Sequence, residues 1–189
     1  MDVPVIMDEF VEFCREATLG DGAREAIRAE MDRLFDDPVT LADSIPRFTN
    51  DAVEVSPRGF RLGGEHPVHR SPELTVMVLD TLPGVIQPPH DHGMVAMIGV
   101  FEGCEEQRFW ARRDDGIVAT TGRLLEAGEV ITLGERAIHA ISAPAHAPAR
   151  AIHVYLGDIY DVERSIFDPE TLTEHPMTDD RYDEFCRPA

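Results

Sequence analysis

The chain of 189 residues is long enough for one domain with a sizeable core, and 43% of its residues are hydrophobic. Its formal net charge of -19 disfavours binding to nucleic acid or to an anionic membrane surface. All 17 basic residues are arginines, and the lack of lysine excludes Schiff-base chemistry on a lysine, including attachment of pyridoxal phosphate.

Cysteine usage and targeting signals indicate the compartment. Cys14, Cys104 and Cys186 are far apart and odd in number, which favours reduced thiols over a disulfide framework. The sequence shows no signal peptide and no apolar run of roughly twenty residues, so we expect a cytoplasmic protein without a membrane partner. It also lacks a glycine-rich phosphate loop, a Cys-x-x-Cys pair and a Gly-x-Ser-x-Gly elbow.

The N-terminal part has a helical pattern. Apolar residues recur at three- and four-residue steps over residues 5–36. Gly20 is expected to end the first helix and Asp21 to cap the second. Pro38 begins a further short turn. We expect these acidic helices, within residues 1–48, to cover one side of a barrel.

From about Asp51 the sequence changes to short apolar and β-branched runs separated by Gly, Pro and Asp. The runs expected to form strands are Ala52–Val55, Gly59–Leu62, Leu74–Leu79, Val95–Phe101, Glu106–Ala111, Ile117–Leu125, Val130–Leu133, Ala137–Ile141 and Arg150–Leu156. Short strands at this spacing, without intervening helices, predict an all-β sandwich or jelly-roll barrel over residues 51–156. The acidic tail, residues 157–189, is expected to wrap this single domain (1–189) as loops, with a brief helix at Asp179–Phe185.

Two histidines stand in the stretch from Pro83 to Gly103. His90 and His92 are two residues apart, so on a strand they would point to the same face. Neutral imidazole nitrogens held in this way can share a metal ion. We expect a turn, a strand carrying the two histidines and the apolar run Val95–Phe101 to form a hairpin unit of the barrel.

A second segment completes a known pattern. Gly128, Gly134 and His139 follow the spacing of the second cupin motif, and the stretch from Pro83 to Gly103 resembles the first. Leu133 takes the place of the usual proline. The resemblance implies a cupin double-stranded β-helix with an N-terminal helical cap. It also implies that one histidine pair and one late histidine, His90, His92 and His139, meet inside the barrel and bind a metal.

The carboxylate ligand of many cupins is missing. Ala96 and Met97 stand at the places of this glutamate, and Glu102 is expected to lie in a turn. Three neutral imidazoles leave the charge of a metal ion uncompensated. Such a site favours an anionic ligand such as a thiolate, whose pKa the metal lowers.

A narrower likeness covers roughly residues 69–169. The sequence His-Asp-His-Gly at 90–93, the run Ile-Gly-Val-Phe-Glu-Gly at 98–103 and the strand Arg150–Tyr155 resemble the thiol dioxygenases. This family comprises cysteine dioxygenase and, more similar to this chain, bacterial 3-mercaptopropionate dioxygenase. Its members bind non-heme Fe(II) through three histidines, which are followed by a Ser-x-His-x-Tyr strand.

The late strand matches that pattern in part. His153 and Tyr155 match the last two members, and Ala151 takes the serine place. Because alternate residues share a face, His153 and Tyr155 can point into the barrel beside the metal; a buried core histidine is the alternative for His153. Met97 occupies the place of the cysteine that is cross-linked to the tyrosine in animal enzymes, so no such cross-link can form. The remaining histidines, expected to face solvent, are His66, His69, His146 and His175.

The resemblance implies a mononuclear Fe(II) thiol dioxygenase, an oxidoreductase that converts a small thiol to its sulfinate with O2. A metal-dependent cupin lyase, isomerase or non-thiol oxygenase is the first alternative, with Tyr155 as general acid or base. A non-catalytic small-ligand binder is the second. Cysteine, 3-mercaptopropionate and a thiol tail on a larger molecule all fit the sequence, as do a monomer and a homodimer.

Two arginines are candidates for binding a substrate carboxylate, because a planar guanidinium can pair both oxygens. Arg70 precedes the strand on the barrel side that supplies this arginine in cysteine dioxygenases. Arg164 lies in a segment that resembles the one supplying the substrate arginine in 3-mercaptopropionate dioxygenases. A surface ion pair with Glu163 or Asp161 is the alternative role for Arg164.

Overall fold

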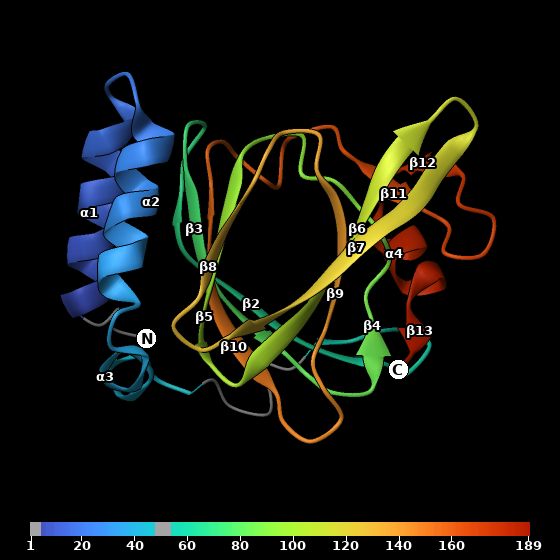
Figure 1. Cartoon of the computed structure of the whole chain (residues 1–189), viewed down its shortest axis with the longest axis horizontal. Coiled ribbons are helices and arrows are strands. Elements are labelled where there is room, and N and C mark those ends of the chain that lie inside the picture. The colour runs from blue at the N-terminus through green and yellow to red at the C-terminus, as the bar shows by residue number, and fades with distance from the viewer. Residues whose placement is uncertain (1–4, 48–53) are drawn as a thin grey trace.

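The computed structural model describes residues 5–47 and 54–189, in which two antiparallel sheets enclose a barrel (Figure 1). The first sheet has the order β1 (Glu54–Val55), β2 (Arg61–Arg70), β3 (Thr75–Thr81), β10 (Ala149–Tyr155), β5 (Ala96–Glu102) and β8 (Val130–Leu133). The second has the order β13 (Arg187–Pro188), β4 (Val85–Ile86), β9 (Ile138–Ser142), β6 (Cys104–Arg113) and β7 (Gly116–Glu126). Strands distant in sequence, such as β3 and β10, are neighbours, as in a double-stranded β-helix. The predicted all-β cupin fold is confirmed.

The strands β3, β10 and β5 in the middle of the six-stranded sheet are buried on both faces, which explains their nearly continuous apolar sequences. In β10, Ile152 and Val154 pack toward the helices, whereas Ala151 and Tyr155 belong to the cluster inside the barrel. This alternation follows from the two-residue period of a strand. It also directs His153, which lies between Ala151 and Tyr155 on the inner face, into the barrel.

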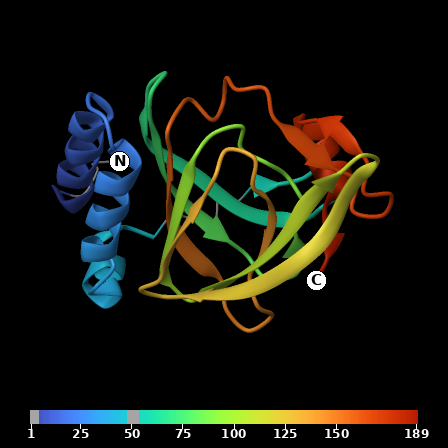
Figure 2. The ribbon, with the colours of Figure 1, turned by 45° about the horizontal axis from the view of Figure 1, so that its top comes forward.

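Three helices cover the outer face of this sheet, as predicted: α1 (Val5–Thr18), α2 (Ala23–Leu34) and α3 (Pro38–Ser44) (Figures 1 and 2). Pro38 lies in the first turn of α3, where its missing N–H costs no hydrogen bond. The prediction that Asp21 caps the second helix is wrong. Gly22 occupies the N-cap in a left-handed conformation (φ 87°), and no side chain caps this helix.

The cap is joined to the barrel by a close contact between Phe35 and Gly99. The ring of Phe35 is buried against β5, and a Cβ atom at Gly99 would lie 2.4 Å from its Cζ atom. We expect Gly99→Ala to lower the free energy of unfolding by about 1–3 kcal/mol, because the added methyl overpacks the contact. Chemical denaturation measures this. Gly134→Ala is the control, since nothing lies within 4 Å of its Cβ position. Equal effects of the two substitutions would contradict the close contact.

The tail contains the expected helix, α4 (Asp179–Phe185). The rest of the tail has more regular structure than predicted. Two short strands, β11 (Ser165–Phe167) and β12 (Glu174–Pro176), pair with each other. The tail also hydrogen-bonds to the barrel, since Phe167 N–H donates to Pro89 O (2.8 Å) and Asp91 N–H donates to Ser165 O (3.1 Å). The expectation of loops was wrong because strands of two or three residues are too short to show a period in the sequence.

The remaining predicted strands and the predicted state of the cysteines agree with the structure in most respects. The predicted strands have counterparts, although residues 52 and 53 of the first lie outside the described residues and the second extends to Arg70. The three cysteines are free thiols. Within the part of the chain that the structure describes, no helix has the length and apolar character needed to cross a membrane.

Candidate metal centre

Three histidines from two separate segments meet inside the barrel. His139 lies on β9, and His90 pairs with it through two backbone hydrogen bonds, His90 N–H to His139 O and His139 N–H to His90 O, each 2.9 Å. The prediction of a regular strand carrying both His90 and His92 was wrong, since only His90 makes a β-bridge. Two prolines without a backbone N–H precede it, and Gly93 turns the chain with φ 66°.

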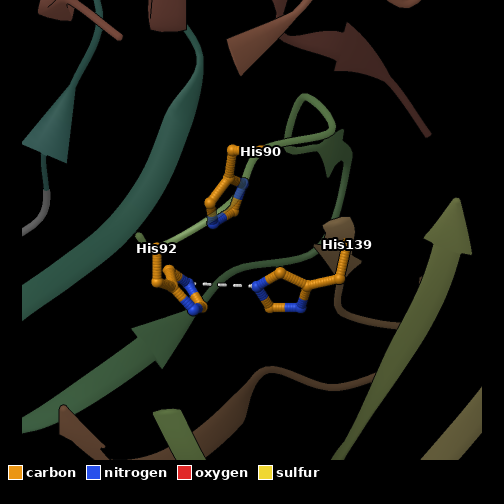
Figure 3. Close-up of side chains that lie close together, drawn as sticks. All are labelled: His90, His92 and His139. Atoms are coloured by element: carbon orange, nitrogen blue, oxygen red, sulfur yellow. Dashed lines mark hydrogen bonds between the residues drawn. The ribbon is translucent and has the colours of Figure 1, made fainter. Parts of the chain in front are cut away.

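The side chains nevertheless point toward one another (Figure 3). Each ring offers one nitrogen, and these three atoms lie within 4.8 Å of one another. The Nε2 atoms of His92 and His139 are 3.2 Å apart. A search of the His, Cys, Asp and Glu side chains among the described residues finds these three histidines as the group that could hold a metal ion. The donor set is therefore three imidazoles without a carboxylate.

Hydrogen bonds fix which nitrogen faces the centre. His90 Nδ1–H donates to Pro88 O (3.0 Å), and His139 Nδ1–H donates to Gln107 Oε1 (2.8 Å). In both rings Nε2 is left for a metal, which is the usual arrangement around metal-bound histidines.

The imidazoles are held in their neutral form. Burial lowers the pKa of His90 to about 4, and burial together with neighbouring imidazoles lowers the pKa of His92 and of His139 well below the usual value. A metal binds neutral imidazole, so these rings have no proton to lose on binding at neutral pH. The residues present therefore fit a divalent transition-metal ion.

A buried polar chain supports His139 from behind. Gln107 Nε2–H donates to Glu105 Oε1 (2.6 Å), and the Thr81 hydroxyl donates to Glu105 Oε2 (3.0 Å). The side chain of Glu105 is fully buried, and burial raises its pKa to about 7. The sequence analysis missed these hydrogen-bonded residues. Polar residues at both 105 and 107, on one face of a strand, were a signal for them.

Glu105 should make stability depend on pH. Its folded-state pKa, about 7, lies above the ordinary value of 4.5. The folded state therefore binds the proton more tightly, and the stability that this proton contributes is fully present below about pH 4.5 and is lost as the pH rises through 7. The shift corresponds to about 3 kcal/mol.

Glu105→Gln mimics the protonated side chain and should remove this dependence. We expect the variant and the unchanged protein to have similar stabilities near pH 4.5, and the variant to be more stable at pH 8. Denaturant unfolding across this pH range measures the difference. A constant difference in stability at all pH values would contradict a raised pKa at Glu105.

A cavity of about 280 Å³ opens from the three histidines, and both His153 and Tyr155 line it. His153 Nδ1 and the Tyr155 hydroxyl are hydrogen-bonded at 2.9 Å. The second ring nitrogen of His153, Nε2, is buried without a hydrogen-bond partner. His153 is thus both a buried histidine and a cavity residue.

Burial also sets the protonation of this pair. It lowers the pKa of His153 to about 3 and raises the pKa of Tyr155 above its usual value. At neutral pH the pair therefore consists of a neutral imidazole and a protonated phenol.

The two candidate arginines have different surroundings. Arg164 lines the cavity, and its charge contributes to lowering the pKa of His90 and His92. It makes no ion pair with the described residues, so the pairs with Glu163 or Asp161 are not formed. Arg70 is outside the cavity lining. Its guanidinium pairs with Asp158 (2.9 Å) and covers the ring of Tyr160.

The position of Arg164 depends on the segment between the metal-site histidines. Asp91 Oδ1 accepts a hydrogen bond from Ser165 N–H (3.0 Å), and its other oxygen pairs with Arg112. These contacts place β11, and with it Arg164, beside His90. Sequence reasoning did not identify Asp91 or Arg112.

Other charged and titratable residues lie away from the centre. Glu102, at the end of β5, pairs with Arg150 (3.3 Å), and it is not a cavity residue. His146 is exposed, as predicted. The expectation that His66, His69 and His175 face solvent was wrong: they are half-buried because they lie on β2 and β12.

The solved structures to which this chain is similar are distant from it in sequence. No protein-family model matches the sequence. The DMSP lyase DddQ from Ruegeria pomeroyi is similar at 17% identity and a TM-score of 0.49, over 66% of this chain and 61% of the lyase. This chain therefore spans less than two thirds of that protein. An uncharacterised double-stranded β-helix protein from Klebsiella pneumoniae is similar at 16% identity and a TM-score of 0.46, over 64% of this chain and 89% of that chain. A cupin 2 barrel protein from Leptotrichia buccalis is similar at 14% identity and a TM-score of 0.43, over 59% of this chain and 44% of that chain.

Proposed function

We propose that this protein is a mononuclear non-heme Fe(II) dioxygenase that oxidises a small thiol to its sulfinate. The observation that carries the proposal is the donor set: three neutral imidazoles, without a carboxylate, beside a hydrogen-bonded His153–Tyr155 pair in one cavity. The motif likeness to thiol dioxygenases supports the same assignment. His90, His92 and His139 would hold the iron, and the iron would supply thiolate binding and the redox chemistry of dioxygen.

The reaction is balanced without an external reductant. A thiol RSH and O2 give the sulfinic acid RSO2H: the S–H and O–O bonds break, two sulfur–oxygen bonds form, and the thiol proton ends on oxygen. The sulfur loses four electrons and dioxygen gains four. The protein therefore needs to bind a thiol and O2 together, orient them and exclude water.

The residues around the centre fit these tasks. Tyr155 stays protonated, so its hydroxyl can hold a proton beside the ligand. His153 Nδ1 fixes the orientation of that hydroxyl through a hydrogen bond of 2.9 Å. Arg164, the unpaired cavity guanidinium among the described residues, can bind a substrate carboxylate through both oxygens.

The proposal is tested by reconstituting the protein anaerobically with Fe(II), adding a panel of small thiols and then admitting air. We expect oxygen uptake that requires iron and a thiol product heavier by two oxygen atoms, read by mass spectrometry. Absence of both across the panel would overturn the proposal. Turnover under strict anaerobiosis would instead indicate a lyase or isomerase, in which the metal acts as a Lewis acid.

A further inference from the structure

The hydrogen bonds behind His139 all run toward one carboxylate. His139 Nδ1–H donates to Gln107 Oε1 (2.8 Å), and Gln107 Nε2–H donates to Glu105 Oε1 (2.6 Å). The hydroxyl of Thr81 donates to the other oxygen of Glu105 (3.0 Å). All four side chains are buried, and Glu105 has an exposed fraction of 0%. Bulk water therefore does not compete for these hydrogen bonds.

A glutamate is a costly residue at this place. The two partners of Glu105, a hydroxyl and an amide, are neutral, so neither compensates a negative charge. Burial accordingly raises the pKa of Glu105 to about 7. A glutamine has nearly the same shape and would avoid the cost of a buried charge. Stability alone would favour glutamine, so the carboxylate serves another purpose.

An ionised carboxylate differs from an amide because it can only accept hydrogen bonds. The side chain of Gln107 must therefore turn its NH2 group toward Glu105 and its oxygen toward His139. That amide oxygen also only accepts, so the proton of the His139 ring is held on Nδ1. The other ring nitrogen, Nε2, keeps its lone pair for a metal.

An amide at position 105 would allow the order of donors and acceptors to reverse. Gln107 could then accept from residue 105 and donate to His139 Nδ1, and the ring proton would move to Nε2. This atom lies 3.2 Å from His92 Nε2 (Figure 3). The proton would therefore occupy the place where the three histidines converge, and it would have to leave before a metal could bind.

We propose that Glu105 is a positioning residue of the metal centre, which acts through Gln107 to hold the proton of His139 on Nδ1 and to keep Nε2 free for the metal. Glu105 lies outside the cavity lining and reaches His139 only through the amide. The role concerns metal binding, so it applies to any reaction at this centre and does not rest on thiol oxidation.

Nitrogen-15 NMR of the metal-free protein at pH 8 reads the position of the ring proton, because protonated and unprotonated ring nitrogens differ in chemical shift. The signals of His139 are those that His139→Ala lacks. We expect the unchanged protein to carry this proton on Nδ1 and Glu105→Gln to give a mixture of the two forms. A proton on Nε2 in the unchanged protein, or the same position in both proteins, would overturn the proposal.

Binding of Co(II) at pH 8, measured by competition with a chelator, gives a second reading. Loss of a hydrogen-bond partner of a metal-binding histidine typically costs roughly 10–100-fold in metal affinity. Because Glu105 acts through Gln107, we expect Glu105→Gln to weaken Co(II) binding about five- to tenfold. The same variant is expected to be more stable at pH 8, so weaker binding would not come from a damaged fold.

Glu106→Gln is the matched control, since it removes the same charge from the next residue of β6. Glu106 is 44% exposed, pairs with Arg108 and lies on the opposite face of the strand. Its substitution should change Co(II) affinity less than about twofold and leave the proton of His139 on Nδ1. Equal weakening in both variants, or weaker binding by Glu105→Gln with the proton still on Nδ1, would show an effect of charge alone and overturn the positioning role. No thiol takes part in these measurements, so their outcome is independent of thiol oxidation.

Discussion

Changing His139 to alanine is expected to remove most of the bound iron and all turnover. The same result is expected for His90→Ala and His92→Ala, because each substitution removes one of the three nitrogens that converge within 4.8 Å. Loss of a residue that merely supports a ligand typically costs roughly 10–100-fold in metal affinity. Loss of one of three ligands should cost more. Metal content after anaerobic loading and gel filtration measures it.

Two other histidines serve as controls for the metal measurement. His153→Ala changes a buried histidine of the same cavity that is not part of the converging trio, so this variant should keep its iron. His146→Ala changes an exposed histidine and should behave like the unchanged protein. Full iron in His139→Ala, or loss of iron in His153→Ala, would show that the set of ligands is wrong.

The second large effect is expected at Arg164, on substrate rather than on metal. Arg164→Ala should keep its iron, because the arginine is not among the converging nitrogens. For a thiol that carries a carboxylate, loss of the paired charge should cost about 2 kcal/mol or more, which raises KM about thirtyfold. Steady-state oxygen uptake with 3-mercaptopropionate and with cysteamine measures the effect. Cysteamine has no carboxylate, so its KM should change little.

Arg70→Ala is the matched control for this experiment. It also removes a guanidinium, but one that pairs with Asp158 outside the cavity lining. Its KM values for both thiols should stay close to those of the unchanged protein. If Arg164→Ala affected both thiols equally, the arginine would support the structure and not recognise the carboxylate.

The short, regular strands of the sequence predict the β-rich fold, and its resemblance to the two cupin motifs implies that the three histidines converge. His90 and His92 are separated by one residue, and His139 follows a glycine, a strand and a turn. Strand alternation puts His153 and Tyr155 on one face, the likeness to thiol dioxygenases implies that this face is the inner one, and both residues line the cavity.

Other parts of the site depend on tertiary contacts that leave little trace in the sequence. A glutamate in a strand, such as Glu105, usually faces solvent, and only the packing of β6 against the rest of the barrel buries it. Asp183 stands in a tail whose acids Asp179, Asp180 and Glu184 are exposed, so its burial follows from the docking of α4. The chain around His90 departs from a regular strand because of its prolines, yet the contact with β9 brings the imidazoles together.

Isotope labelling is the most direct test of thiol oxidation at the three-histidine centre. The Fe(II)-loaded protein is supplied with a small thiol and with dioxygen labelled as 18O2 in unlabelled water. The account predicts a sulfinate in which both oxygen atoms carry the label, with no product from the His139→Ala protein. A product whose oxygen comes from water, or a labelled product formed equally well by His139→Ala, would contradict it.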